Sequence, residues 1–238
     1  MGKLQKNVRE SLLWPAYLIG LLWVIEVFQA LSGISFKMLG IWPRHWDAWY
    51  GVFLAPLLHS GFPHLLANTP PLYALTAMVL FFYRKVAIAS FNMIYLLTGL
   101  AVWIFGRDNA VHIGASGVVY GLVAFVFWNG VFRRNIKSIV LALIVLFYYG
   151  GMFTGILPGK EDVSWESHLL GGLAGVFTSF WFMKKIEGDE KKPVYSWELE
   201  APKDDDYFLD RDTFEKTKKQ RETEKQSRED PGWFSDHT

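Results

Sequence analysis

Residues 113–121 read IGASGVVYG, and residues 167–175 read SHLLGGLAG. Each stretch places one polar and chemically reactive side chain, Ser116 or His168, at the start of a long apolar run. A polar side chain at membrane depth costs free energy unless it has a partner or a cavity, so such residues mark candidate functional sites. The two stretches therefore indicate membrane helices that carry the chemistry of the protein.

Apolar runs of about 20 residues are long enough to cross a bilayer as helices. The chain contains six such runs, at roughly 12–31, 65–83, 86–105, 116–132, 138–157 and 167–183. They predict an all-α polytopic membrane protein with six transmembrane helices over residues 1–186. The fourth and sixth runs are short, which suits helices that begin below the membrane surface. A cleaved signal peptide is the alternative for residues 1–31, although this run is longer than a typical signal core.

Charge divides the chain into an apolar body and a polar tail. Residues 187–238 hold 16 acidic and 10 basic side chains, whereas residues 1–186 hold 7 acidic and 14 basic ones. This asymmetry excludes a single soluble domain. We expect the tail to be disordered or a lone solvated helix, and to be dispensable for the chemistry. Because the chain has no cysteine, disulfides and thiolate nucleophiles are excluded as well.

Lysine and arginine are concentrated on one side of the predicted spans. Ten lie in one set of short segments, and the other set holds only Lys37, Arg44, Arg107 and Lys160. Since cytoplasmic loops carry the excess, both termini are predicted to be cytoplasmic, in a multi-pass protein of a prokaryotic cell (inner) membrane. The connection 32–64 then lies outside. Its Trp, Phe and Leu content predicts short helices in the outer interface.

The fourth and sixth spans run in the same direction, so Ser116 and His168 share a depth. Small residues four apart let two helices approach closely in a membrane. Gly117 and Gly121 form such a pair after Ser116. After His168 come Gly171 or Gly172 and then Gly175, and Gly171 is the one that precedes Gly175 by four residues. A hydroxyl beside an imidazole is the minimum for an activated nucleophile. The alternatives are that Ser116 only caps its helix and that His168 is a polar interface residue.

A third motif, HSGFPHLLAN, opens the second span at residues 59–68. His64 and Asn68 are four residues apart on one helix face, where both could donate hydrogen bonds to a developing negative charge. His59 lies just outside the span and could order water or hold the loop. We expect no metal, because this face offers no carboxylate and no second adjacent histidine.

Together these motifs resemble those of the rhomboid family of intramembrane serine proteases, over about residues 10–185. The residues that carry the resemblance are His59, His64 and Asn68, then Gly114, Ser116, Gly117 and Tyr120, then His168, Gly171 and Gly175. The resemblance implies a catalytic dyad of Ser116 and His168, and an oxyanion hole of His64, Asn68 and the Ser116 backbone N–H. It also implies that Tyr120 packs on the histidine ring and that the substrates are transmembrane helices. We expect no cofactor and no nucleic-acid partner.

Three positions depart from the family pattern. Tyr50 and Gly51 stand where a Trp-Arg pair is common, so the first loop must be anchored differently. Ala55 replaces a frequent histidine, and Pro70 with Pro71 follows Asn68 inside the second span. Prolines remove helix hydrogen bonds, so a kink could widen the opening beside the fifth span or simply be accommodated.

Two acidic residues bear on the choice of mechanism. Glu166 precedes His168 by two residues, which turns it to another helix face, so stacking on Tyr120 is the expected substitute for an orienting carboxylate. Glu26 in the first span is the best argument for the rival reading. In that reading the chain is a transporter-like or catalytically silent rhomboid-like protein that binds transmembrane partners.

Overall fold

The computed structural model describes residues 2–157, 164–185, 187–188 and 214–229. Within these ranges the chain is helical apart from turns, loops and one isolated backbone pairing between Ile41 and His112. The chain divides into two units, Met1–Lys191 and Lys192–Thr238. The first unit holds all of the apolar runs and all of the candidate site residues.

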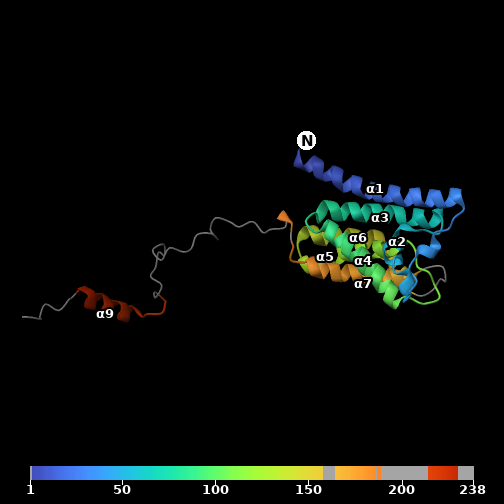
Figure 1. Ribbon diagram of the computed structural model, residues 1–238. Helices are drawn as coiled ribbons and strands as arrows, with labels where there is room; N and C mark the ends of the chain where they lie inside the picture. Colours follow the sequence, from blue (N-terminus) through green and yellow to red (C-terminus); the bar gives the residue numbers. More distant parts are fainter. Residues whose placement is uncertain (1, 158–163, 186, 189–213, 230–238) are drawn as a thin grey trace, which may run out of the picture. The chain divides into compact units, whose positions relative to one another are not determined.

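Six long helices build this first unit (Figure 1). They are α1 (Lys3–Ser32), α3 (Phe62–Phe82), α4 (Ala87–Phe105), α5 (Ser116–Arg133), α6 (Ile136–Tyr149) and α7 (Trp165–Phe182). Among the described residues, five segments are long and apolar enough to cross a membrane: α1, α3, α4, α5 and the stretch Ile136–Ile156. The α7 helix is 18 residues long but opens with Glu166, Ser167 and His168, which makes it less apolar. The all-α polytopic class is therefore confirmed, and the sixth span stays a prediction.

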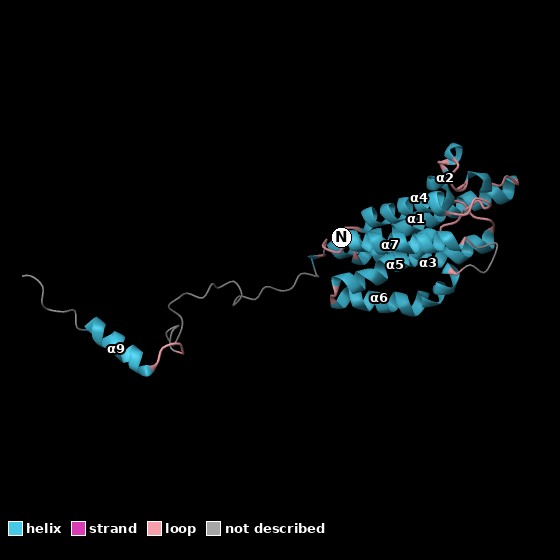
Figure 2. Cartoon of the chain, turned by 90° about the horizontal axis from the view of Figure 1, so that it is seen from below, coloured by secondary structure: helices cyan, strands magenta, loops and turns pink. Residues whose placement is uncertain are grey.

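The α5 helix is the centre of the bundle. It packs against α7, α6, α3 and α4, whereas α1 packs mainly on α3 at the edge (Figures 1 and 2). The side chains of Leu122, Phe125 and Val126 on α5 are completely buried. The first residue of this helix, Ser116, is half-buried.

Backbone contact joins α5 to α7, as the glycine spacing predicted. A Cβ atom built on Gly171 would overlap the carbonyl oxygen of Gly117, and one built on Gly175 would overlap that of Gly121. Gly172 has nothing within 4 Å of such an atom, so Gly171 is the member of the pair that faces α5. Only glycine permits this separation, which brings the first turns of the two helices together.

Short helices fill the first loop, as predicted: Lys37–Leu39, Trp46–Ala48, α2 (Gly51–Leu54) and Ala55–Leu57. Arg44 anchors this loop, since its guanidinium donates to the carbonyls of Ile104 (2.8 Å) and Gly106 (2.9 Å) at the end of α4 and pairs with Asp108. The anchor that replaces the missing Trp-Arg pair is therefore an arginine six residues earlier than Tyr50.

The prolines of α3 lie inside a helix that runs without a break from Phe62 to Phe82. The side chain of Thr69 donates to the carbonyl of Leu65 at 2.9 Å and accepts from the Trp23 indole at 3.1 Å. This second contact ties α3 to α1 at the position of the prolines.

In the polar tail, α9 (Lys218–Glu229) is a helix without an apolar face. The stretches 189–213 and 230–238, predicted to be disordered or solvated, lie outside the described residues. Glu187, the first residue of the predicted tail, is buried in the first unit, where its carboxylate accepts from the Lys85 backbone N–H at 2.8 Å.

Candidate active site

Ser116 and His168 face each other across the α5–α7 contact. The Oγ of Ser116 lies 2.9 Å from Nε2 of His168. Ser116 is the first residue of α5, and the residue at the cap position is Ala115, so the interpretation of Ser116 as a helix cap is wrong. The hydroxyl is engaged by the imidazole instead.

The other ring nitrogen of His168 has a backbone partner. Its Nδ1 lies 2.8 Å from the carbonyl oxygen of Gly155, in the 3-10 segment η4 (Gly150–Ile156) that continues α6. A carbonyl oxygen can only accept, so Nδ1 carries the hydrogen. In a neutral imidazole Nε2 then has the lone pair, and it accepts the hydrogen bond from Ser116.

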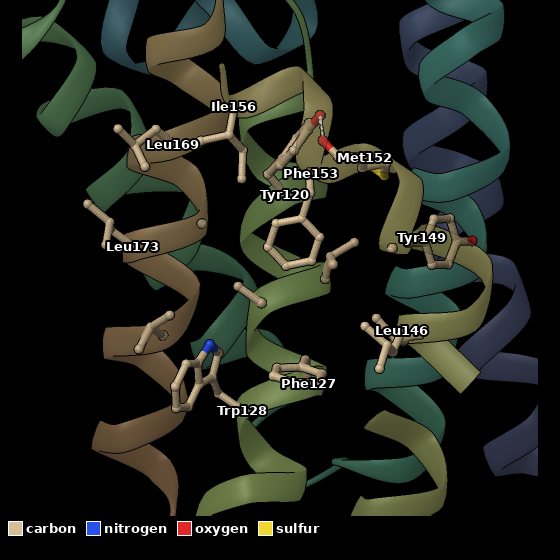
Figure 3. Close-up of a pocket in the computed structure, with 16 residues that line it drawn as sticks. Tyr120, Phe127, Trp128, Leu146, Tyr149, Met152, Phe153, Ile156, Leu169 and Leu173 are labelled. Atoms are coloured by element: carbon tan, nitrogen blue, oxygen red, sulfur yellow. Dashed lines mark hydrogen bonds between the residues drawn. The ribbon is translucent and has the colours of Figure 1, made fainter. Parts of the chain in front are cut away.

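Tyr120 covers the histidine ring. The two rings are stacked, with centroids 4.2 Å apart and planes 11° from parallel. The Tyr120 hydroxyl donates to the carbonyl of Met152 at 2.7 Å, so the tyrosine is also held by η4 (Figure 3). Tyr120, one turn beyond Ser116 on α5, thus packs on the His168 ring, as the resemblance implied.

His64 and Asn68 lie on the opposite wall. The ring of His64 lies close to Gly114: a Cβ atom built on Gly114 would come within 2.7 Å of this ring. Gly114 also has a φ of 111°, a backbone conformation that disfavours any other residue. The Nδ1 of His64 is 3.1 Å from the Ser60 hydroxyl, and the Asn68 amide donates to the His64 carbonyl at 3.0 Å.

A cavity of about 1010 Å³ connects these walls. Its polar lining includes Ser60, His64, Asn68, His112, Ser116, Ser164 and His168. On the far side of Tyr120 and Met152 lies a separate, almost wholly apolar pocket of about 260 Å³ between α5, α6 and α7 (Figure 3). The two residues therefore form a partition between the polar cavity and the apolar pocket.

His59 supports this wall from behind and does not line the cavity. Its ring meets that of His64 edge to face, with centroids 5.1 Å apart, and only 4% of its surface is exposed. Burial, together with the neighbouring His64 ring, lowers the pKa of His59 to about 4. The residue is therefore a neutral packing partner at pH 7.

His112 joins the first loop to the start of α7. Its backbone pairs with Ile41, and its Nδ1 lies 2.6 Å from the hydroxyl of Ser164, which in turn contacts the hydroxyl of Ser167 at 2.5 Å. Burial lowers the pKa of His112, although the nearby Glu166 carboxylate opposes the shift. This chain of contacts ends one residue before His168.

The two acidic residues of interest have other partners. Glu166 is buried and pairs with Arg107, with Oε1 and Nε 3.1 Å apart, so it does lie on a different face from His168. Glu26 accepts from the side chain of Gln29 at 2.9 Å, and Gln29 accepts from the backbone N–H of Phe36 at 2.7 Å. Glu26 thus takes part in holding the end of α1.

The contacts of η4 were missed at the level of sequence, because backbone carbonyls have no residue signature. The sequence feature that could have indicated this irregular segment is the cluster of Gly150, Gly151 and Gly155 at the end of the fifth apolar run.

These features define an integral, multi-pass membrane protein with a serine–histidine pair in a polar cavity. The Rhomboid domain model matches residues 46–185. An uncharacterized protein of Mycobacterium tuberculosis is 37% identical over 170 residues, covering 68% of this chain and 71% of its own. One from Mycobacterium leprae is 33% identical over 170 residues, covering 68% and 67%. The rhomboid-like protein 11 of Arabidopsis thaliana is 27% identical over 191 residues, covering 70% and 66%. The chain belongs to the rhomboid family.

Proposed function

We propose that this protein is an intramembrane serine endopeptidase that cleaves transmembrane-helix substrates through a dyad of Ser116 and His168. The observation that carries the proposal is the 2.9 Å contact between Ser116 Oγ and His168 Nε2, inside a polar cavity of a membrane protein. A hydroxyl hydrogen-bonded to a correctly oriented base is the arrangement of an activated nucleophile.

The reaction is acyl transfer to water. Ser116 Oγ attacks the carbonyl carbon of the scissile bond while His168 Nε2 takes the hydroxyl proton. His168 then returns this proton to the leaving amine as the carbon–nitrogen bond breaks, which leaves an acyl-enzyme on Ser116. A water molecule, deprotonated by His168, attacks the ester and releases the carboxyl product. The proton finally returns to Ser116, so both residues are regenerated.

The negative charge of the tetrahedral intermediate needs donors in the cavity. We assign this role to His64, Asn68 and the backbone N–H of Ser116, since the first N–H groups of a helix have no acceptor within it. If the Ser60 hydroxyl donates to Nδ1 of His64, then Nε2 of His64 carries a hydrogen and can serve as a donor. Gly114 leaves the room that this ring requires.

The membrane setting supports transmembrane helices as the class of substrate. The proposed dyad lies at the start of two helices of a membrane bundle, so we infer that the scissile peptide bond belongs to a segment that itself lies in the bilayer. We propose accordingly that both termini are cytoplasmic and that the cavity opens to the outer face of a prokaryotic cell membrane. The predicted tail, residues 187–238, then forms a separate segment only beyond Lys191, because Glu187 is buried in the first unit.

A fluorophosphonate probe tests the function directly. The purified protein should become labelled on Ser116, the Ser116→Ala variant should not, and a model transmembrane substrate should be cleaved only by the first. Absence of both labelling and cleavage in a correctly inserted protein would favour the silent, partner-binding alternative.

A further inference from the structure

The end of the fifth span touches the dyad at two places. The Gly155 carbonyl accepts from His168 Nδ1 at 2.8 Å, and the Met152 carbonyl accepts from the Tyr120 hydroxyl at 2.7 Å. Both acceptors belong to η4, so one short segment holds the imidazole and also the ring stacked on it. A serine–histidine pair ordinarily needs a third group to orient the base.

We propose that Gly155 is a positioning residue, whose carbonyl orients His168 and thereby makes activation of Ser116 depend on where η4 lies. The inference rests on the proposed function and adds to it a third group supplied by the backbone of another span. Because the acceptor is a carbonyl, it selects the tautomer in which Nε2 is free to take the serine proton.

The hydrogen bond from His168 Nδ1 to the Gly155 carbonyl also matters when positive charge develops on the imidazole. Once His168 has taken the proton, both ring nitrogens carry hydrogen and the ring is positive. A hydrogen bond from a charged donor is stronger than one from a neutral donor, so the Gly155 carbonyl stabilises the imidazolium more than the resting ring. This is the role that a carboxylate would have, and Glu166 is unable to fill it because it pairs with Arg107.

The absence of a side chain at Gly155 allows η4 to lie this close to Tyr120 and His168. A Cβ atom built there would overlap the Tyr120 hydroxyl and would lie 3.3 Å from His168 Nδ1. Gly151 in the same segment has nothing within 4 Å of an added Cβ atom. The requirement for glycine is thus specific to the position whose carbonyl meets the histidine.

The geometry of η4 differs from that of the helix it continues. The α6 helix gives way at Gly150 to 3-10 geometry, whose hydrogen bonds are poorer than those of an α-helix. Phe153 in this segment is 66% exposed and lines the apolar pocket between α5, α6 and α7. Displacement of η4 would remove both hydrogen bonds at once and leave His168 without its orienting partner.

The experiment compares Gly155→Ala with Gly151→Ala as the matched control. Gly155→Ala should lower both the rate of fluorophosphonate labelling and kcat by about 10- to 100-fold, the range in which loss of the hydrogen-bond partner of a metal-bound histidine lowers activity. KM should change less than twofold, and Gly151→Ala should behave as wild type. Tyr120→Phe loses only the hydrogen bond to the Met152 carbonyl and keeps the Gly155 contact with His168, so its labelling rate should fall less than that of Gly155→Ala.

A spectroscopic readout separates orientation from activity. In ¹⁵N-histidine-labelled protein, with the His168 signals assigned by comparison with His168→Gln, wild type should show a protonated Nδ1, and Gly155→Ala should show a mixture of tautomers. Wild-type labelling in Gly155→Ala, or a Gly155→Ala protein that labels slowly while His168 keeps the wild-type Nδ1 tautomer, overturns the inference. A wild-type protein that shows the Nδ1 tautomer but never labels would contradict the proposed function and leave the orientation intact.

Discussion

Glu166 stands two residues before His168, yet its carboxylate pairs with Arg107, Oε1 to Nε at 3.1 Å, and makes no bond to the imidazole. The Glu166 carboxylate therefore joins α7 to Arg107, in the segment that precedes α5, instead of contacting His168. In the proposed dyad, Ser116 and His168 therefore act as a unit of two side chains, and the Gly155 carbonyl is the backbone partner of the histidine. This relationship shapes the predictions that follow.

Substitution of either dyad residue should abolish proteolysis. Once Ser116 is lost there is nothing for His168 to activate, and the reverse also holds, so Ser116→Ala, His168→Ala and the double variant should be equally inactive. Cleavage of a model transmembrane substrate in proteoliposomes measures this. His168→Ala should also fail to react with a fluorophosphonate, and a His168→Ala protein that labels like wild type would show the dyad to be wrong.

Substitution of a proposed oxyanion donor should lower the rate of cleavage without abolishing it. Loss of one such donor typically costs about 10²- to 10³-fold in rate, because the remaining donors still stabilise part of the charge. We expect this range for kcat in Asn68→Ala and in His64→Ala. Ser60→Ala serves as a milder control, since it removes only the partner of His64. Wild-type rates in both main variants would take these residues out of the site.

The glycine contact between α5 and α7 gives a prediction about stability. Gly171→Ala should force the helices apart, since the new Cβ atom overlaps the Gly117 carbonyl, and overpacking of this kind typically costs about 1–3 kcal/mol. The melting temperature in detergent should fall, together with the labelling rate. Gly172→Ala, on the same helix with open space around it, should match wild type in both.

Acid should destabilise the fold through His59. Its folded pKa of about 4 lies below the ordinary 6.5, so the unfolded chain binds the proton first as the pH falls. Stability is thus complete above pH 6.5 and declines between 6.5 and about 4, by up to about 3 kcal/mol for this group. Melting temperatures measured across this window should fall less steeply in His59→Gln. A residual slope is expected from His112, whose pKa is also lowered. Parallel slopes in wild type and His59→Gln would refute the assignment.

Topology can be read with reporter fusions. Fusions at Gly2 and Thr238 should report the cytoplasm and one at Ser60 the outside, because Lys and Arg crowd the segments on the cytoplasmic side. A cytoplasmic signal from Ser60, which lines the cavity, would mean that the site opens inward.

The apolar runs predicted the long helices, but the bounds and the geometry of two of them differ in the structure. The first run begins near residue 12, but α1 begins at Lys3, since apolar character marks the part of a helix in the bilayer and not where the helix starts. The fifth run, 138–157, is continuous in composition yet changes from α to 3-10 geometry at Gly150. Three glycines in seven residues hinted at this change.

The contact between Ser116 and His168 was predictable because helix direction and glycine spacing together fix the depth and the facing of the two side chains. The contacts of Gly155 and Met152 were not, since a carbonyl is present at every residue and only the tertiary path of η4 selects these two. The contact between the side chains of His112 and Ser164 was missed for a different reason, because it joins two loops that are 52 residues apart and follows no helix spacing. Side chains that recur in a pattern can be found from sequence, whereas backbone acceptors cannot.

The contact of Gly171 with Gly117 is one of main chain against main chain, a single turn from the reactive serine and histidine. No side chain intervenes that could grow, shrink or change rotamer. The spacing of the two reactive atoms is therefore fixed by the thickness of the peptide backbone itself. The outward faces of α5 and α7, including the exposed Phe177 and Trp181, can then vary with the lipids of the host without disturbing the contact between Ser116 and His168.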